Sequence, residues 1–289
     1  VKRYLSLLNF YNKHQVNFDL LIISDIKNDF LTINPKLNNR VIFKHSGLKK
    51  PIKGINEIFK SILINSHILK KYKYSLFVED DNFVFPDAIL KCKKFLENNF
   101  NFISANGTSF LFFKQNKFKY LNFYNLPISL QSESILKRAT NYSGGIFYYS
   151  LFKTKIFIKI LKKIIKIKDN NLSEIFFNFQ ALKYGKHKRL NNIFLAREYP
   201  RPKIYNIPIF SKWTKSKNIL IEISTLSKIL IKDIKKKNQL SFLILTLYKY
   251  LLQRLKKNKK KVIQLKLYKQ NKNKVMSIVR FINYLNKKF

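Results

Sequence analysis

The chain has 289 residues, of which 46% are hydrophobic and 15% aromatic. This length and composition provide the core of one large α/β domain with an accessory element, and they exclude a globally disordered protein. The net charge is +43, from 58 lysines and arginines against 15 aspartates and glutamates. A charge of this size raises nucleic acid and anionic membrane surfaces as partners.

The kind of basic residue argues against nucleic-acid recognition. Only eight of the 58 basic residues are arginine, the residue best suited to bidentate contacts with phosphates and bases. Lysines occur along the whole chain, and no known nucleic-acid-binding module is present. We therefore expect no specific nucleic acid partner. Over residues 1–200 we interpret the lysines as solvent-exposed, which makes the scarce acidic residues the informative ones.

Strand and helix signals alternate in the first part of the chain. The expected elements there are a helix at 4–13, strands at 18–24 and 39–43, a helix at 52–71, a strand at 74–78 and a helix at 86–98. Strands that alternate with helices of this length are typical of right-handed βαβ units and a parallel sheet.

The second part continues the alternation and then changes character. The expected elements are an extended segment at 100–113 broken at Asn106-Gly107, a strand at 117–124, a helical turn at 132–140, a strand at 146–150, helices at 154–168 and 172–184, and a strand at 192–196. From residue 218 onward there are only lysine-punctuated helical segments. We expect an α/β domain over residues 1–205 and a basic helical C-terminal extension over residues 206–289.

An acidic motif stands between the expected strand at 74–78 and the expected helix at 86–98. It places Glu79, Asp80 and Asp81 at the carboxyl edge of the sheet, where open α/β folds bind ligands. Crowded carboxylates favour a hard cation such as Mg²⁺ or Mn²⁺, which would in turn hold a diphosphate. The alternative is a solvated acidic turn in which Asp81 or Asn82 caps the following helix.

The ordered residues around this motif resemble the nucleotide-sugar domain of family 2 glycosyltransferases, which have the GT-A fold. The resemblance runs from Asp25 through Asp80-Asp81-Asn82 to Pro86. It is closer to a bacterial group in which an acidic triplet plus Phe precedes a helix ending in a Phe-Leu-Glu-like stretch, here residues 95–97. It continues through 138–152 and 173–198 and covers roughly residues 1–200.

The resemblance implies a GT-A type domain with a mostly parallel sheet and a role for each matched residue. Asp25 would accept the imino proton of uracil or a related base, and Asp80 would contact the ribose. Asp81, with its neighbour Asn82, would bind Mn²⁺ or Mg²⁺ between the two phosphates. Asn82 stands where relatives often have a third acidic residue. The implied donor is a nucleotide sugar, with a UDP-sugar favoured.

The resemblance also implies a catalytic base and phosphate contacts. Inverting transfer needs a group that takes the proton from the acceptor hydroxyl, and Glu174 occupies the place where the family keeps that carboxylate. The alternative role of Glu174 is to complement a helix N-terminus electrostatically. Arg138 and Arg197 are candidates for contacts with phosphate or acceptor, because arginine pairs well with phosphate. The implied acceptor is a saccharide or a lipid-linked molecule.

One departure from the family concerns its first strand. The family begins with a strand that carries a Pro and an Asn-Arg-like turn, just before the helix that begins here at residue 3 or 4, and this sequence shows no such strand. That strand would lie in the middle of the sheet, where missing backbone partners are costly. The missing strand favours a degenerate, non-catalytic binding protein, which we keep as an alternative, together with a basic protein that binds membrane surfaces or nucleic acid. The ordered acidic residues favour the main expectation, a hexosyltransferase-like glycosyltransferase.

The basic tail and the cysteine usage bear on location. Residues 240–257 combine a leucine-rich segment with basic residues, a pattern that suits either a helix on an anionic membrane or a helical subdomain packed on the main domain. The chain has one cysteine, Cys92, and no visible secretory signal. We expect a cytoplasmic protein, with the tail as a candidate peripheral contact to the cytoplasmic membrane face.

Overall fold

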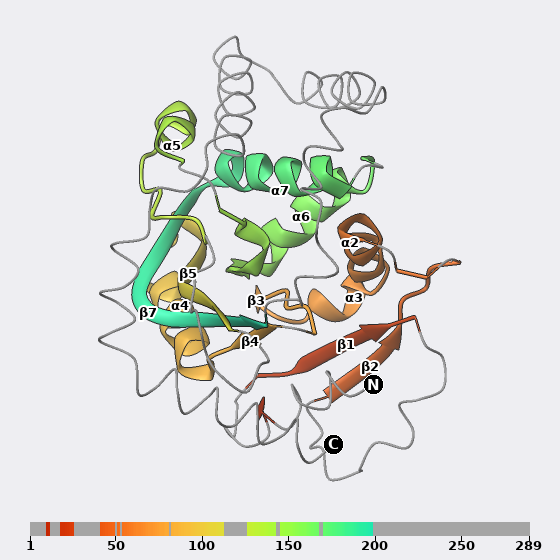
Figure 1. Ribbon diagram of the computed structural model, residues 1–289. Coiled ribbons are helices and arrows are strands. Elements are labelled where there is room, and N and C mark those ends of the chain that lie inside the picture. Colours follow the sequence, from red (N-terminus) through yellow and green to blue (C-terminus); the bar gives the residue numbers. More distant parts are fainter. Residues whose placement is uncertain are drawn as a thin grey trace.

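The computed structural model describes residues 10–11, 18–25, 41–49, 51–52, 54–80, 82–112, 126–142, 145–167 and 170–198. These residues form a mixed α/β structure with a two-stranded and a five-stranded sheet (Figure 1). The expected strand at 117–124, most of the expected helix at 4–13 and the C-terminal extension 206–289 lie outside the described residues.

The two-stranded sheet consists of β1 (Leu20–Ser24) and β2 (Val41–His45), which pair in parallel. Both segments are rich in apolar and β-branched residues, as expected for strands. All five residues of β1 are half-buried, and the last two of β2 are exposed. This sheet therefore has no fully buried strand.

The five-stranded sheet has the order β3-β6-β5-β7-β4. Its strands are β3 (Tyr74–Ser75), β6 (Leu151–Lys153), β5 (Phe102–Phe112), β7 (Lys186–Glu198) and β4 (Asn82–Val84). Only β5 and β7 pair in parallel, and the other three pairings are antiparallel. The mostly parallel sheet is therefore not confirmed. The alternation of strands and helices predicted βαβ units. In the structure, α4 connects β4 to β5, but β7 lies between these two strands in the sheet, so β4 and β5 are not neighbours.

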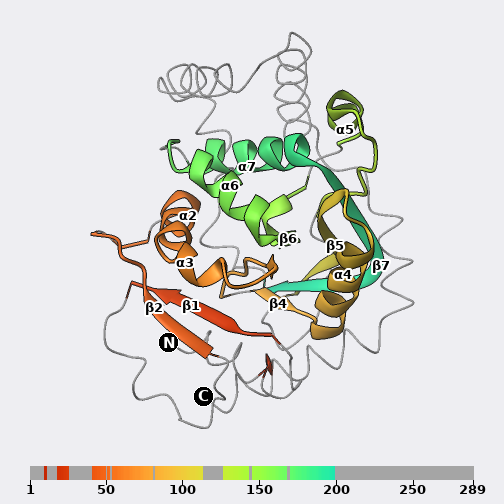
Figure 2. The same cartoon turned by 180° about the vertical axis from the view of Figure 1, so that it is seen from behind.

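The helices form two groups around this sheet (Figures 1 and 2). They are α2 (Ile55–Ile64), α3 (Ser66–Leu69), α4 (Pro86–Asn98), α5 (Ile135–Asn141), the 3₁₀ turn η1 (Phe147–Tyr149), α6 (Thr154–Ile164) and α7 (Asn170–Tyr184). Helix α4 packs on β5 and β7, whereas α2, α6 and α7 pack on one another and α6 also contacts β3 and β6. None of the described helices has the length and apolar character needed to cross a membrane.

Two expected elements differ from the structure for local reasons. The helix expected at 52–71 is divided at Asn65, whose Nδ2 donates to the carbonyls of Ser61 at 2.9 Å and His45 at 3.3 Å. This side chain bonds the backbone in place of a continued helix. The strand expected at 146–150 is instead the 3₁₀ turn η1, in which the Phe147 N–H donates to Asn178 Oδ1 at 3.1 Å.

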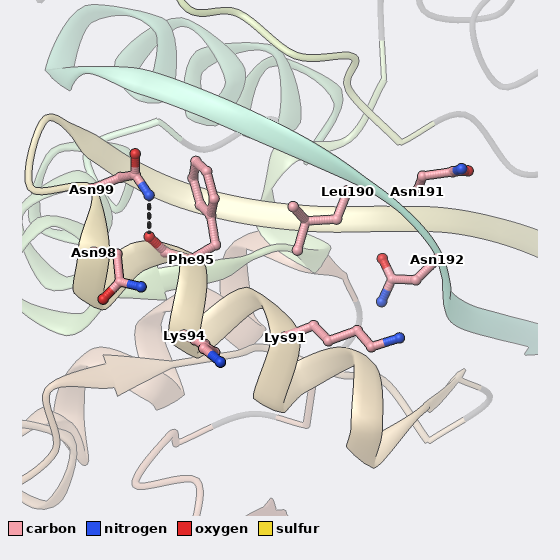
Figure 3. A pocket seen from close by; sticks show the side chains of 8 residues that line it. All are labelled: Lys91, Lys94, Phe95, Asn98, Asn99, Leu190, Asn191 and Asn192. Carbon is pink, nitrogen blue, oxygen red and sulfur yellow. Dashed lines mark hydrogen bonds between the residues drawn. The ribbon is translucent and has the colours of Figure 1, made fainter.

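A bulge interrupts the pairing of β5 with β7. Asn106 is paired with Arg189 and Thr108 with Ile193, so the three residues 190–192 oppose Gly107 alone. A Cβ atom at Gly107 would lie 2.4 Å from the Asn192 carbonyl oxygen, and this close approach requires glycine. Figure 3 shows the bulged part of β7, with Leu190 to Asn192, crossing β5 beside helix α4.

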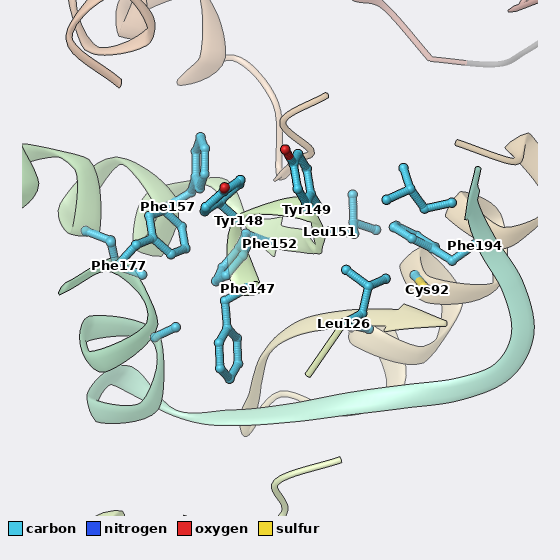
Figure 4. Packing of buried hydrophobic residues seen from close by; sticks show 14 of the residues in the cluster. Cys92, Leu126, Phe147, Tyr148, Tyr149, Leu151, Phe152, Phe157, Phe177 and Phe194 are labelled. Carbon is cyan, nitrogen blue, oxygen red and sulfur yellow. The ribbon is translucent and has the colours of Figure 1, made fainter. Parts of the chain in front are cut away.

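The core is dominated by aromatic side chains (Figure 4). Phe177 of α7 is fully buried and lies at the centre of this cluster. Its ring centroid is 5.5 to 5.9 Å from those of Phe59, Tyr148, Phe152 and Phe157. These contacts join the helical layer to β6 through Phe152 and to η1, which precedes β6 in the chain, through Tyr148.

Candidate functional site

Four polar side chains from four segments meet at one end of the five-stranded sheet. Oε2 of Glu79 accepts hydrogen bonds from the Tyr149 hydroxyl and from Asn82 Nδ2 at 3.4 Å, and it forms an ion pair with Arg197 Nη2 at 3.1 Å. Arg197 Nη1 also donates to the Tyr149 hydroxyl at 2.9 Å. We call Glu79, Asn82, Tyr149 and Arg197 the Glu79 cluster.

The backbone explains why these residues meet. The Asn82 N–H donates to the Glu79 carbonyl at 3.1 Å, so residues 79–82 form a tight turn. In the antiparallel register of β4 with β7, Asn82 is directly opposite Arg197, and directly opposite residues present their side chains on the same face. Tyr149 stacks on Phe77, with ring planes 11° apart.

The Glu79 cluster is partly shielded from solvent. The Arg197 and Glu79 side chains are 21% and 23% exposed, and the guanidinium carbon of Arg197 lies 5.6 Å from the Tyr149 ring centroid. Because partial burial strengthens charge interactions, these contacts hold the guanidinium in one orientation. An oriented guanidinium and a phenol are groups that can donate to phosphate oxygens.

Asp80 lies on the turn itself and is exposed, whereas Asp81 lies outside the described residues. Carboxylate and amide oxygens at positions 80 to 82 are of the kind that Mg²⁺ and Mn²⁺ prefer. Within the described ranges, no group of three or more His, Cys, Asp or Glu side chains is placed to hold a metal. The donor atoms at positions 80 to 82 thus fit a divalent cation in chemical kind, whereas the described residues alone do not form a metal site.

The acidic turn does not cap helix α4. The N-cap residue is Phe85, and it makes no side-chain capping bond. Pro86 at the first helical position needs no hydrogen bond to its nitrogen. The capping role considered for Asp81 or Asn82 is thus not what starts this helix.

Asp25 and Ser173, the residue before Glu174, belong to a second set of contacts. Asp25 follows β1, is exposed, and its Oδ2 accepts a hydrogen bond from the Ile52 N–H at 3.0 Å. A few residues further on, Asn56 Nδ2 donates to Ser173 Oγ at 2.9 Å. Glu174 is the next residue on α7 and is half-buried. Ile52 thus contacts the end of β1, and Asn56 contacts the N-terminal part of α7.

Arg138 lies elsewhere, between α5 and the C-terminal end of α7. Its side chain is buried, and its guanidinium donates to four backbone carbonyls. The acceptors are Leu182 at 2.9 Å, Ser132 at 2.6 Å, Glu133 at 2.8 Å and Lys183 at 3.5 Å. The bonds to Leu182 and Lys183 satisfy carbonyls at the C-terminus of α7, where a cation is favourable. Arg138 therefore ties α5 to α7, and this buried position differs from the phosphate contact expected of it.

Sequence reasoning assigned roles to Arg197 and Asn82 but none to Glu79 or Tyr149. Glu79 opens the acidic triplet, so its position was visible, but its partner Arg197 is 118 residues away and no short spacing indicates the pair. Tyr149 is one of 16 tyrosines, and nothing in its neighbours distinguishes it. Only the fold brings these residues together.

The fold resembles that of TarS, a GT-A-like glycosyltransferase. The chain is similar to the crystal structure of S. aureus TarS 1-349, with 12% sequence identity and a TM-score of 0.50, over 84% of this chain and 67% of that chain. A second TarS crystal structure aligns with 12% identity and a TM-score of 0.46, over 85% of this chain. This chain spans 40% of the length of that TarS chain. No family model and no curated protein matches the sequence.

Proposed function

We propose that this protein is a glycosyltransferase of the family 2 type, which moves a sugar from a nucleoside-diphosphate donor to an acceptor hydroxyl. The observation that carries the proposal is the Glu79 cluster, within a GT-A-like fold: an oriented Arg197 lies beside Glu79 and Asn82, which flank Asp80 and Asp81 in the sequence. A UDP-sugar donor and a saccharide or lipid-linked acceptor are the partners that we propose.

Arg197 and Tyr149 are proposed to meet the diphosphate. When the bond between the sugar and the diphosphate breaks, negative charge develops on the leaving group. A guanidinium that is already oriented can stabilise this charge with little reorganisation. Glu79 holds Arg197 in place through the 3.1 Å ion pair, so we assign Glu79 a positioning role.

Asp80 and Asp81, with Asn82, are the residues that would hold Mn²⁺ or Mg²⁺. Such a metal supplies Lewis-acid stabilisation of the diphosphate. Calorimetric titration of UDP into the protein, with and without Mn²⁺, tests this role by binding alone. Tighter binding with Mn²⁺ that is lost in Asp81→Ala supports it, and equal affinity in both conditions argues against it.

Glu174 is proposed as the general base and Asp25 as the residue that contacts the nucleotide base. A carboxylate near the acceptor takes the hydroxyl proton as the new bond forms. Glu174→Gln keeps the size and helix propensity of the side chain but removes its proton affinity. We expect turnover to fall roughly 100-fold or more with nearly unchanged donor binding. The measurement is transfer or slow donor hydrolysis under saturating nucleotide sugar.

Glu133→Gln is the matched control, because Glu133 is an exposed carboxylate that pairs with Lys186 away from the Glu79 cluster. It should retain the wild-type rate. A Glu174→Gln variant that is also as fast as wild type removes Glu174 as the base. A wild-type protein that binds UDP but hydrolyses none of the common sugar donors supports the non-catalytic alternative instead.

A further inference from the structure

A second candidate site lies between helix α4 and the bulge of β7. A cavity of about 360 Å³ is lined there by Lys91, Lys94 and Phe95 of α4 and by Leu190, Asn191 and Asn192 of β7 (Figure 3). This volume is within the usual range for a small-molecule pocket. Asn192 is five residues before Arg197, which is about 16 Å along a strand, so this cavity is separate from the Glu79 cluster.

The bulge creates the cavity wall. Residues 190–192 oppose Gly107 alone, so their backbone leaves the regular ladder where it passes α4. Bulges of this kind redirect side chains and are frequent next to functional sites. The requirement for glycine at position 107 shows that the close approach of the two backbones is built into the sequence.

The Asn192 side chain is the second observation that points to a ligand. Its Nδ2 and Oδ1 atoms are both buried, and neither has a hydrogen-bond partner among the described residues. A buried amide without partners is costly in free energy, and such groups call for an explanation. A ligand with two hydroxyl groups suits this amide, because one hydroxyl can donate to Oδ1 and the other can accept from Nδ2.

The charge of the cavity indicates an anion. Lys91 and Lys94 are three residues apart and therefore lie on one face of α4. Both are exposed, and neither forms an ion pair with any residue in the described part of the chain. By contrast, Lys93 points to another face and lies 3.9 Å from Glu97. Two ammonium groups on one face match a phosphate dianion.

The remaining lining residues give the ligand an orientation. Phe95 and Leu190 are half-buried and face each other, and they offer an apolar surface for the C–H face of a sugar ring. The C-terminal end of α4, at Asn98, carries partial negative charge from the helix dipole. An anion is therefore favoured toward Lys91, and hydroxyl groups toward Asn98 and Asn99.

We propose that this cavity binds a sugar phosphate, with the phosphate on Lys91 and Lys94 and the hydroxyls on Asn192 and its neighbouring amides. The proposal does not depend on the transferase activity proposed above. The probe is glucose 6-phosphate, titrated calorimetrically into the full 289-residue chain at about 0.15 M salt, where unspecific attraction to the basic surface is screened.

We expect glucose 6-phosphate to bind more tightly than inorganic phosphate. The double variant Lys91→Gln, Lys94→Gln should weaken its binding roughly tenfold or more, because two charge-assisted contacts are lost. The matched control is Lys93→Gln, on the same helix but outside the cavity, which should bind as wild type does. Asn192→Ala should weaken glucose 6-phosphate but not inorganic phosphate. Its unfolding temperature should be unchanged or higher, because the variant loses an unsatisfied buried amide.

Three results would overturn the proposal. One is the absence of glucose 6-phosphate binding by the wild-type protein. Another is an equal loss of affinity in Lys93→Gln and in the double variant, which would reflect overall charge only. The third is inorganic phosphate bound as tightly as glucose 6-phosphate, since the amides would then recognise no sugar.

Discussion

The two sheets of this protein differ in how tightly their strands are packed against the rest of the molecule. The five-stranded sheet packs against α4 and against the helical layer, and Phe152 and Phe194 on its strands are fully buried. In the two-stranded sheet, every residue of β1 is half-buried. An isolated strand pair is only marginally stable, so β1 and β2 depend on the neighbouring helices for their position.

This difference extends to the proposed site residues. Arg197 is held by Glu79 and by Tyr149, which is itself packed in the aromatic core. Asp25 is held by the Ile52 N–H alone among the contacts described for it. Residues on well-packed supports are held within narrow limits, whereas residues on loose supports can adjust to a ligand. The diphosphate side of the proposed site is therefore the rigid side, and the nucleotide-base side is the adaptable one.

The largest effect should come from removing a side chain at the centre of the core. Phe177→Ala should lower the free energy of unfolding by about 3 to 5 kcal/mol, because it deletes a fully buried ring and leaves a cavity. The comparison variant is Ile22→Ala in half-buried β1, which should cost roughly 1 kcal/mol. Urea unfolding of both variants measures the difference. Equal losses would contradict the contrast between the two sheets.

A pH-dependent effect of intermediate size should come from His187 in β7. Burial lowers the pKa of His187 to about 3, whereas its pKa in the unfolded chain is about 6.5. Between pH 3 and pH 6.5, the His187 imidazole is protonated in the unfolded chain but not in the folded one. The free energy of unfolding therefore falls as the pH falls below 6.5. The loss at pH 5 should be about 2 kcal/mol.

The measurement for His187 is urea unfolding at pH 7 and pH 5, for the wild type and for His187→Leu. The variant loses the bond between Nδ1 and Ser104 Oγ, which are 2.8 Å apart, so it should be less stable at both pH values. Its further loss between pH 7 and pH 5 should nevertheless be smaller than that of the wild type. An identical loss in the two proteins would show that His187 is not held neutral by the sheet.

The smallest effect on stability should come from Asp25→Ala. The change removes one hydrogen bond at an exposed position, so the free energy of unfolding should fall by less than about 1 kcal/mol. If Asp25 contacts the nucleotide base as proposed, the same variant should bind UDP several-fold more weakly, and calorimetry measures both the binding and its loss. Unchanged UDP affinity would leave Asp25 with only its contact to Ile52.

The elements that could be predicted from the sequence are those with local signals. The helix expected at 86–98 is confirmed as α4, because Pro86 begins it and its apolar residues recur at helical spacing. The break expected at Asn106-Gly107 is wrong for β5, which continues from Phe102 to Phe112, and the irregularity beside Gly107 is the bulge of β7. The position of β7 between β4 and β5 could not be predicted, since it depends on pairing between distant segments and leaves no periodic pattern.

The same distinction applies to the candidate site. The acidic turn is contiguous in sequence and was visible for that reason. Tyr149, which bonds Glu79, lies in η1, where a strand was expected at 146–150. The buried position of Arg138 depends on the carbonyls of Leu182 and Lys183, which the sequence does not place beside it. Tertiary contacts decided the role of each of these side chains.

The pairing of β5 with β7 also has a consequence for how the chain folds during synthesis. Phe102 and Lys186 are partners in this parallel pair, although they are 84 residues apart. Contacts between distant residues form slowly, because a long loop must close first. At roughly 5 to 20 residues per second, a ribosome needs about 4 to 17 s to make the intervening segment. Throughout that interval the eleven-residue strand β5, which is apolar at both ends, has no neighbour on its β7 side, so a chaperone that binds extended segments would have most effect then.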